Sequence, residues 1–223
     1  AVDAFADAGD DVSIDADTLD AVGGNVTIQA TDTITVDEAI ALTTSGASLS
    51  LTTQDSIITI NAPISTTNGA VNLTPGTYIT GDANGSVNSG SAETKIELYD
   101  GGHIGVGGAD CEENTCTMTL SSALLSVITS TGLTIGGADT TNIYLGGLTE
   151  AATANVSGTV TLNAIRTDGE SQIIFQQNRY ESGSNDSKIY FKALTTNSTH
   201  TTYLDGETTI TVGDFNGKAN YYD

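Results

Sequence analysis

The stretch VTIQATDTITVDEAI at residues 26–40 is followed at residues 49–74 by LSLTTQDSIITINAPISTTNGAVNLT. Both stretches consist of short strands in which apolar residues alternate with polar ones, and the pattern of the first returns in the second after about 22 residues. A period of this length is typical of solenoids, in which one repeat cannot bury its apolar face alone and therefore stacks on its neighbours. The two stretches predict a β-solenoid.

Three strands define each predicted repeat. The first strand recurs along most of the chain at Val26 and Ile28, Leu49 and Leu51, Val71 and Leu73, Ile96 and Leu98, Met118 and Leu120, Leu133 and Ile135, and Val160 and Leu162. The second strand is expected at Ile34 and Val36, Ile58 and Ile60, Ile79, Ile104 and Val106, and Leu125 and Val127. A third, weaker strand is expected at Ile40 and Leu42, Ile64, and Val87. Gly, Asn, Asp and Ser separate these strands, as expected for tight bends.

We predict an all-β protein with a right-handed parallel β-helix of about seven triangular coils over residues 12–165. Its strands would stack at the usual separation of about 4.8 Å, with alternate side chains pointing into a narrow interior. An antiparallel sandwich also has short strands and frequent turns, but it does not require similarity every 22 residues. The repeat therefore favours the solenoid.

The composition agrees with a narrow interior. Hydrophobic residues make up 38% of the 223 residues, aromatic residues only 5%, and there is no Trp. With 37 Thr, 19 Ser and 25 Gly against 2 Pro, the chain favours short strands joined by turns.

The net charge of −22 excludes two classes of partner, because such a field repels both nucleic acid and anionic membrane surfaces. No run of about 20 apolar residues suggests a membrane span. The first residues, AVDAFADAGDD, lack the basic start and apolar run of a signal peptide, so we expect a processed chain or a piece of a longer one.

The only cysteines, Cys111 and Cys116, lie in the segment DCEENTC. Their spacing permits a local disulfide that closes a loop, which would imply an oxidising compartment. Two free thiols are the alternative. A zinc site is a weaker interpretation, because no second Cys or His pair lies nearby.

Residues 12–165, and the segment INAPISTTNGA in particular, resemble the coil repeats of filamentous haemagglutinin-type and autotransporter-type β-helical surface proteins. The resemblance is one of repeat style. It implies a β-helical fold, an extracellular or cell-surface location, and a role as an adhesive or scaffolding rod. The family has no catalytic motif to transfer, and the cysteine pair departs from its usually cysteine-poor coils.

The two ends of the chain differ from the coils. Residues 1–11 form an acidic N-terminal arm, whereas residues 166–223 contain five of the six basic residues and eight of the twelve aromatic ones. The runs ESGSNDS, TTNSTH and DGE in this last segment are interpreted as hairpin loops of a divergent β-rich cap or docking module. Head-to-tail contacts or strand addition by the arm would produce a homopolymer.

No cofactor is required by the sequence, and calcium is the ligand that its closely spaced acidic residues would suit best. The candidate ligands are Asp15, Asp17 and Asp20, and separately Asp214 and Asn216. N-glycosylation triplets begin at Asn25, Asn72, Asn84, Asn155, Asn185 and Asn197. A chain with 15 Asn, 37 Thr and 19 Ser produces several such triplets by chance, and Asn84 in DANGSVN is the best placed.

Three functions are compared. We expect a non-enzymatic extracellular structural protein that builds a surface filament or appendage. The first alternative is an adhesin that binds host or matrix glycans, and the second is a polysaccharide-degrading β-helix enzyme. The enzyme is disfavoured, because His103 and His200 stand alone in the sequence and the coils offer few basic or aromatic residues.

Overall fold

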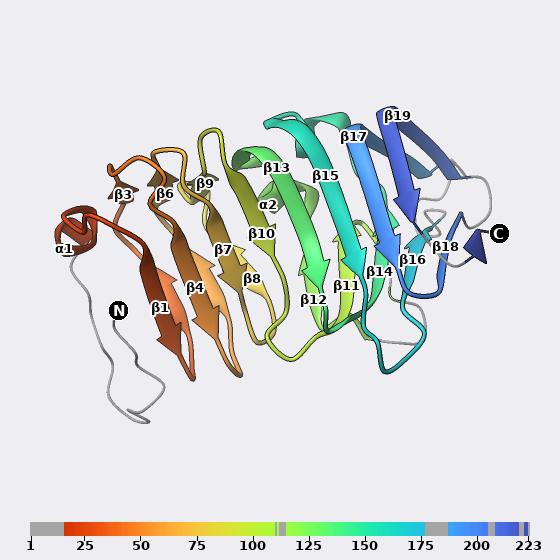
Figure 1. Ribbon diagram of the computed structural model, residues 1–223, viewed down its shortest axis with the longest axis horizontal. Coiled ribbons are helices and arrows are strands. Elements are labelled where there is room, and N and C mark those ends of the chain that lie inside the picture. Colours follow the sequence, from red (N-terminus) through yellow and green to blue (C-terminus); the bar gives the residue numbers. More distant parts are fainter. Residues whose placement is uncertain are drawn as a thin grey trace.

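The computed structural model describes residues 16–109, 111, 115–176, 187–204, 208–218 and 221–222. It is mostly β, and every strand pair within these residues is parallel. The strands form a strongly curled sheet, so the fold is a β-solenoid-like parallel β structure (Figure 1). The prediction of parallel rather than antiparallel strands is confirmed.

The longest row of strands, here called the front sheet, runs from one end of the molecule to the other (Figure 1). It contains β1 (Val26–Ala30), β4 (Leu49–Thr53), β7 (Val71–Thr74), β10 (Glu93–Ile96), β13 (Ile128–Gly137), β15 (Val156–Ala164), β17 (Ser187–Ser198) and β19 (Thr208–Lys218).

Two shorter rows complete the first coils. The short sheet contains β2 (Ile34–Val36), β5 (Ile58–Ile60) and β8 (Ile79–Gly81). The corner row contains β3 (Ile40–Leu42), β6 (Pro63–Thr66) and β9 (Ser86–Asn88), and it joins the front sheet at β13. These coils therefore have three strands each, as predicted.

The later coils use a different second surface, here called the rear sheet. Its order is β12 (Met118–Leu120), β11 (Gly102–Gly107), β14 (Thr140–Gly146), β16 (Gln172–Phe175), β18 (Thr201–Leu204) and β20 (Tyr221–Tyr222). Short helices occupy three positions: α1 (Ala16–Asp20), α2 (Ser122–Ser126) and the 3-10 helix η1 (Glu150–Thr153).

The register of the first three coils matches the repeat in the sequence. Val26 pairs with Leu49 and Leu49 with Val71, so the predicted first-strand residues lie one above another. Ile34, Ile58 and Ile79 align in the same way in the short sheet.

The aligned aliphatic side chains form a single continuous core. Leu49, Leu51, Ile58 and Val71 are completely buried. Burying each such side chain contributes about 1.5–3 kcal/mol, so stacking replaces the globular core that this composition lacks.

Hydroxyl groups line the inside of the corners. Thr53 donates to the carbonyl of Ser56 at 2.9 Å, and Ser89 donates to that of Ala92 at 3.0 Å. Both hydroxyl-bearing residues are buried. Because a buried carbonyl without a partner is costly, these side chains allow the chain to bend inside the stack.

The predicted register fails in the fourth coil. Leu73 pairs with Ile96, so the front-sheet strand there begins two residues earlier than predicted. Met118 does not belong to the front sheet at all: it pairs with Ile104 in the rear sheet. The chain contributes both β11 and β12 to this coil before it returns as β13, which explains the irregular spacing near Leu133.

The strand predicted at Leu125 and Val127 is also wrong, because residues 122–126 form α2. Ser121 caps this helix by accepting a hydrogen bond from the Leu124 amide at 3.2 Å. Leu125 still points into the core, so its apolar character was interpreted correctly but its backbone was not.

The hairpin interpretation of the last segment is wrong as well. β15 pairs in parallel with β17, and β17 with β19, so the front sheet continues past residue 165 without an antiparallel turn. The step from Val160 to its partner Leu194 is longer than in the first coils, because the segment between them also supplies β16. Wider coils, the other form considered for this segment, agree with this pairing.

Candidate functional site

The outer face of the rear sheet carries buried apolar side chains that do not belong to the core. Tyr144 and Ile174 are each 2% exposed, pair with one another across β14 and β16, and form a cluster separate from the core. Their neighbours Ile143 and Ile173 are completely buried in the core. Both faces of these two strands are therefore covered.

The cover on the outer face is the segment around the disulfide. Cys111 and Cys116 are bonded, with Cα atoms 5.3 Å apart, as the sequence predicted. Cys111 belongs to the same cluster as Tyr144 and Ile174, and Cys116 packs against it. A Cβ atom at Gly105 would lie 2.8 Å from the Cys116 sulfur, so only glycine allows this close approach.

His103 lies beside this cover. Its ring is tilted by 58° against that of Tyr144, with 6.1 Å between the ring centroids. Its buried Nδ1 has no hydrogen-bond partner among the described residues, and burial lowers the pKa of the imidazole from its usual 6.5. No described carboxylate orients this nitrogen, so the arrangement lacks the third member of a catalytic triad.

The sequence contained a signal for the covered face that the interpretation did not use. Ile143, Tyr144 and Leu145 are consecutive apolar residues, and so are Ile173 and Ile174. A strand with one wet face alternates, whereas an unbroken apolar run indicates burial on both faces.

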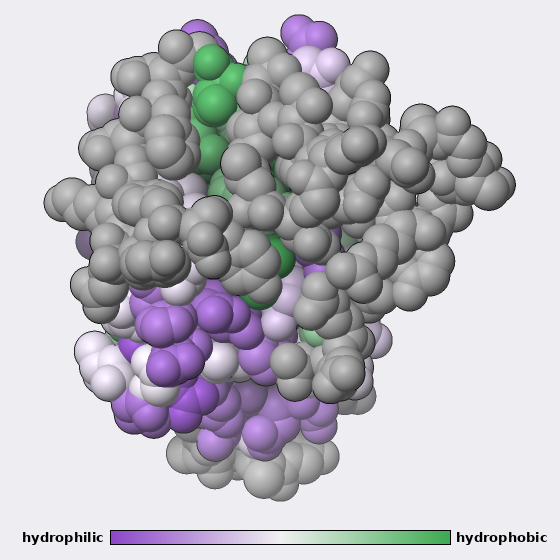
Figure 2. All heavy atoms as spheres, turned by 90° about the vertical axis from the view of Figure 1, so that its right-hand side faces the viewer, coloured by the Kyte–Doolittle hydropathy of each residue, from purple (hydrophilic) through white to green (hydrophobic). Residues whose placement is uncertain are grey.

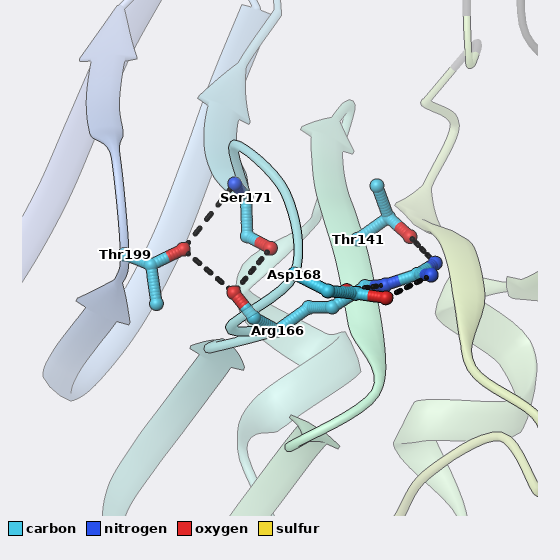
Figure 3. Close-up of polar contacts among 5 residues, drawn as sticks. All are labelled: Thr141, Arg166, Asp168, Ser171 and Thr199. Atoms are coloured by element: carbon cyan, nitrogen blue, oxygen red, sulfur yellow. Dashed lines mark hydrogen bonds and ion pairs between the residues drawn. The ribbon is translucent and has the colours of Figure 1, made fainter.

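A second polar cluster ties three coils together at the lower edge of the molecule (Figure 3). The Arg166 guanidinium forms an ion pair with Asp168 and donates to the Thr141 hydroxyl at 3.3 Å. The Arg166 carbonyl accepts hydrogen bonds from Ser171 at 3.4 Å and from Thr199 at 3.0 Å.

The charges of this cluster cancel one another. The hydrogen bond from Arg166 lowers the pKa of Asp168, and the same contact raises the pKa of the guanidinium. Because the pair is exposed, its contribution to stability is small, and the cluster is best explained as a clamp on the loop between β15 and β16.

The calcium candidates are only partly described. Asp20 uses one carboxylate oxygen to accept the Ala41 amide at 2.6 Å, which ties α1 to β3. Among the described residues, no group of three or more His, Cys, Asp or Glu side chains could hold a metal ion. Asp15 lies outside the described residues, and Asp214 and Asn216 are described only by their place in β19 opposite Ala193 and Thr195.

Four of the glycosylation candidates have side chains engaged in hydrogen bonds. The donors and acceptors are the Asn25 oxygen with the Ser48 amide, and the Asn72, Asn155 and Asn197 nitrogens with Ser50, the Ser126 carbonyl and Asn163. The Asn84 side chain is exposed at the turn between β8 and β9. Asn185 lies outside the described residues.

Comparison with protein-family models, with curated proteins and with solved structures finds no match to the chain. Among the described residues, no helix is both long enough and apolar enough to cross a membrane.

Proposed function

We propose that the chain is a non-enzymatic building block of an extracellular filament, in which the front sheet of one copy continues into that of the next. The contact would join β1 of one copy to β19 of another. Because these are the two different ends of one parallel stack, the contact is heterologous and does not close on itself by two-fold symmetry.

The observation that carries the proposal is the incomplete burial at the first strand. Ile28 is only partly buried, whereas its partner Leu51 and the next residue in that row, Leu73, are 0% and 1% exposed. Among the described residues no strand lies beyond β1. A further coil on this side would complete the burial of Ile28, and a second copy would supply one.

The opposite end has a related character. β19 pairs only with β17 among the described strands, and Val212 within it is a partly buried hydrophobic residue. Viewed onto this end, Figure 2 shows hydrophobic residues in the upper part and hydrophilic residues below. An unpaired strand edge beside an incompletely covered core is a template for strand addition.

Several finer expectations belong to the same proposal. The coils would be right-handed, and residues 166–223 would serve as the docking end of each copy. The resemblance of residues 12–165 to filamentous haemagglutinin-type and autotransporter-type repeats supports an extracellular, scaffolding role. The disulfide also supports export to an oxidising compartment.

The test is to remove a donor from the free edge without breaking the sheet. The Val26 amide donates to the Ser48 carbonyl at 2.8 Å, and the Ala30 carbonyl accepts from Gln54 at 3.0 Å. Since alternate residues of a strand face the same neighbour, the Gln29 amide points away from β4. Gln29→Pro therefore deletes an outward N–H, a change that edge strands tolerate.

We expect natively processed protein to form filaments in negative-stain images. Gln29→Pro should leave folded monomers, and the control Gln29→Ala, which keeps the amide, should still assemble. A wild-type protein that stays monomeric at all concentrations, or a Gln29→Pro variant that polymerises normally, would contradict the proposal.

A second candidate function is adhesion through the outer face of the front sheet. Small polar side chains repeat along this face, and some bond from rung to rung: Asn72 donates to Ser50 at 3.1 Å and Asn197 to Asn163 at 2.7 Å. Such a face is suited to hydroxyl-rich glycans. Binding of the Gln29→Pro monomer to immobilised glycans would favour adhesion, because this variant removes only the end contact.

A further inference from the structure

We propose that Asn84 is an acceptor site for an N-linked glycan, transferred from a lipid-phosphate-linked or lipid-pyrophosphate-linked oligosaccharide. The inference rests on only one part of the proposed function, export from the cytoplasm, and not on polymerisation. It separates one of the Asn-x-Ser/Thr triplets from the others by its place in the fold.

Asn84 lies on an excursion from the coil path. A Cβ atom at either Gly81 or Gly85 would overlap the same group, the Ile60 carbonyl of the preceding coil. The chain thus leaves the stack at Gly81 and returns to the same contact at Gly85. The Gly85 amide donates to the Asp82 carbonyl at 3.2 Å and closes the turn, so residues 82–84 protrude outward.

This corner is also longer than the equivalent corners of the two preceding coils. The connection between β5 and β6 consists of residues 61–62, and that between β2 and β3 of residues 37–39. Between β8 and β9 it consists of residues 82–85. The extra residues leave the strand pairing of Ile64 with Val87 intact, so the insertion is accommodated outside the coil.

The reacting group of Asn84 is accessible. Its side chain is exposed, and its amide makes no hydrogen bond with the described residues; only the backbone N–H is used, donating to Asp82 at 2.7 Å. In contrast, the Asn72 and Asn197 side-chain nitrogens donate along the front sheet at 3.1 and 2.7 Å. A glycan on either nitrogen would remove one of its two protons and crowd this polar face.

The transfer is a balanced substitution. The Asn84 side-chain nitrogen forms a bond to the anomeric carbon of the oligosaccharide and loses one proton to the transferase base. The bond from that carbon to the phosphate oxygen breaks, and the lipid phosphate leaves with the electron pair. The Ser86 hydroxyl, two residues further along, completes the triplet that the transferase recognises.

The sequence allows a clean experiment on protein isolated from its natural source. Cleavage before Asp residues releases residues 82–99, in which Asn84 is the only acceptor triplet, and residues 55–81, in which Asn72 is the only one. The same digest releases residues 110–138, which contain both cysteines and so report whether the protein was exported to an oxidising compartment.

We expect the peptide of residues 82–99 to carry a glycan and that of residues 55–81 to be bare. Asn84→Gln and Ser86→Ala should each abolish the modification, whereas Asn72→Gln should leave it unchanged. A bare Asn84 in protein whose Cys111–Cys116 bond is intact would overturn this inference alone. A bare Asn84 together with free thiols would overturn both it and the proposed extracellular location.

Discussion

At the scale of single residues, the structure depends on close approach between neighbouring coils. Aliphatic residues such as Leu49 and Val71 supply the burial, but glycine decides where two backbones meet. Gly69 is the clearest case, because a Cβ atom there would overlap the Ala47 carbonyl of the preceding coil. Gly23 offers a matched contrast, since a Cβ atom there would meet nothing within 4 Å.

Gly69→Ala is therefore expected to destabilise the protein by about 1–3 kcal/mol, as overpacking does. Gly23→Ala should be neutral, or stabilising by up to about 1 kcal/mol because it restricts the unfolded chain. Denaturant unfolding of both variants measures the difference. Equal shifts of the two midpoints would show that the contact between coils has no special role.

His103 predicts a pH dependence. Burial lowers its pKa below the usual 6.5, so the folded protein favours the neutral imidazole more strongly than the unfolded chain does. The stabilisation is present above pH 6.5 and is lost as the pH falls below it.

Relative to His103→Gln, the wild-type protein should therefore lose stability between pH 7.5 and pH 5, roughly one unit or more either side of the usual histidine pKa. Comparing the two proteins removes the titration of the many carboxylates that both share. A constant difference between their unfolding midpoints over this range would contradict the argument.

At the scale of elements, the segment carrying the disulfide covers the outside of the rear sheet. The chain contains only two cysteines, so a reducing agent acts on this bond alone. For so short a loop, the chain-entropy model assigns the crosslink about 2 kcal/mol.

Reduction, or Cys111→Ser combined with Cys116→Ser, should increase hydrogen exchange in the rear sheet at Tyr144 and Ile174. Exchange at Leu51, in the front sheet and distant along the stack, provides the internal control and should not change. An increase of equal size at both places would indicate global destabilisation rather than loss of a local cover.

The elements also show why the sequence predicted some coils and not others. Around Val26, Leu49 and Val71 each coil has three strands of similar length, so the spacing in sequence equals the spacing in the stack. Met118 has the same local pattern, yet it pairs with Ile104 because the chain doubles back within one coil. Apolar alternation indicates that a strand has a buried face, but it does not specify which neighbour covers that face.

At the scale of the whole molecule, charge opposes assembly. Residues 1–20 contain seven Asp and no basic residue, and residues 166–223 contain five basic and eight acidic residues. Both ends are therefore net negative, and the whole chain carries −22. The attractive part of the proposed end contact must come from strand pairing and apolar burial instead.

Salt should consequently strengthen assembly. Raising the ionic strength shortens the screening length from about 10 Å at 0.1 M to about 3 Å at 1 M and weakens the repulsion between copies. Light scattering should then report filaments at lower protein concentration. Dissolution of filaments by salt would instead indicate that ion pairs between the ends supply the contact.

The sequence by itself determined the parallel solenoid, because inward aliphatic residues that return every 22 to 23 positions have only one way to be buried together. It also determined the disulfide, because Cys111 and Cys116 are close in the chain. Only the tertiary structure decided that β12 lies beside β11, that the disulfide segment covers Tyr144 and Ile174, and that Asn84 protrudes. These features depend on which coil lies against which, and contacts between residues distant in sequence leave no local period to read.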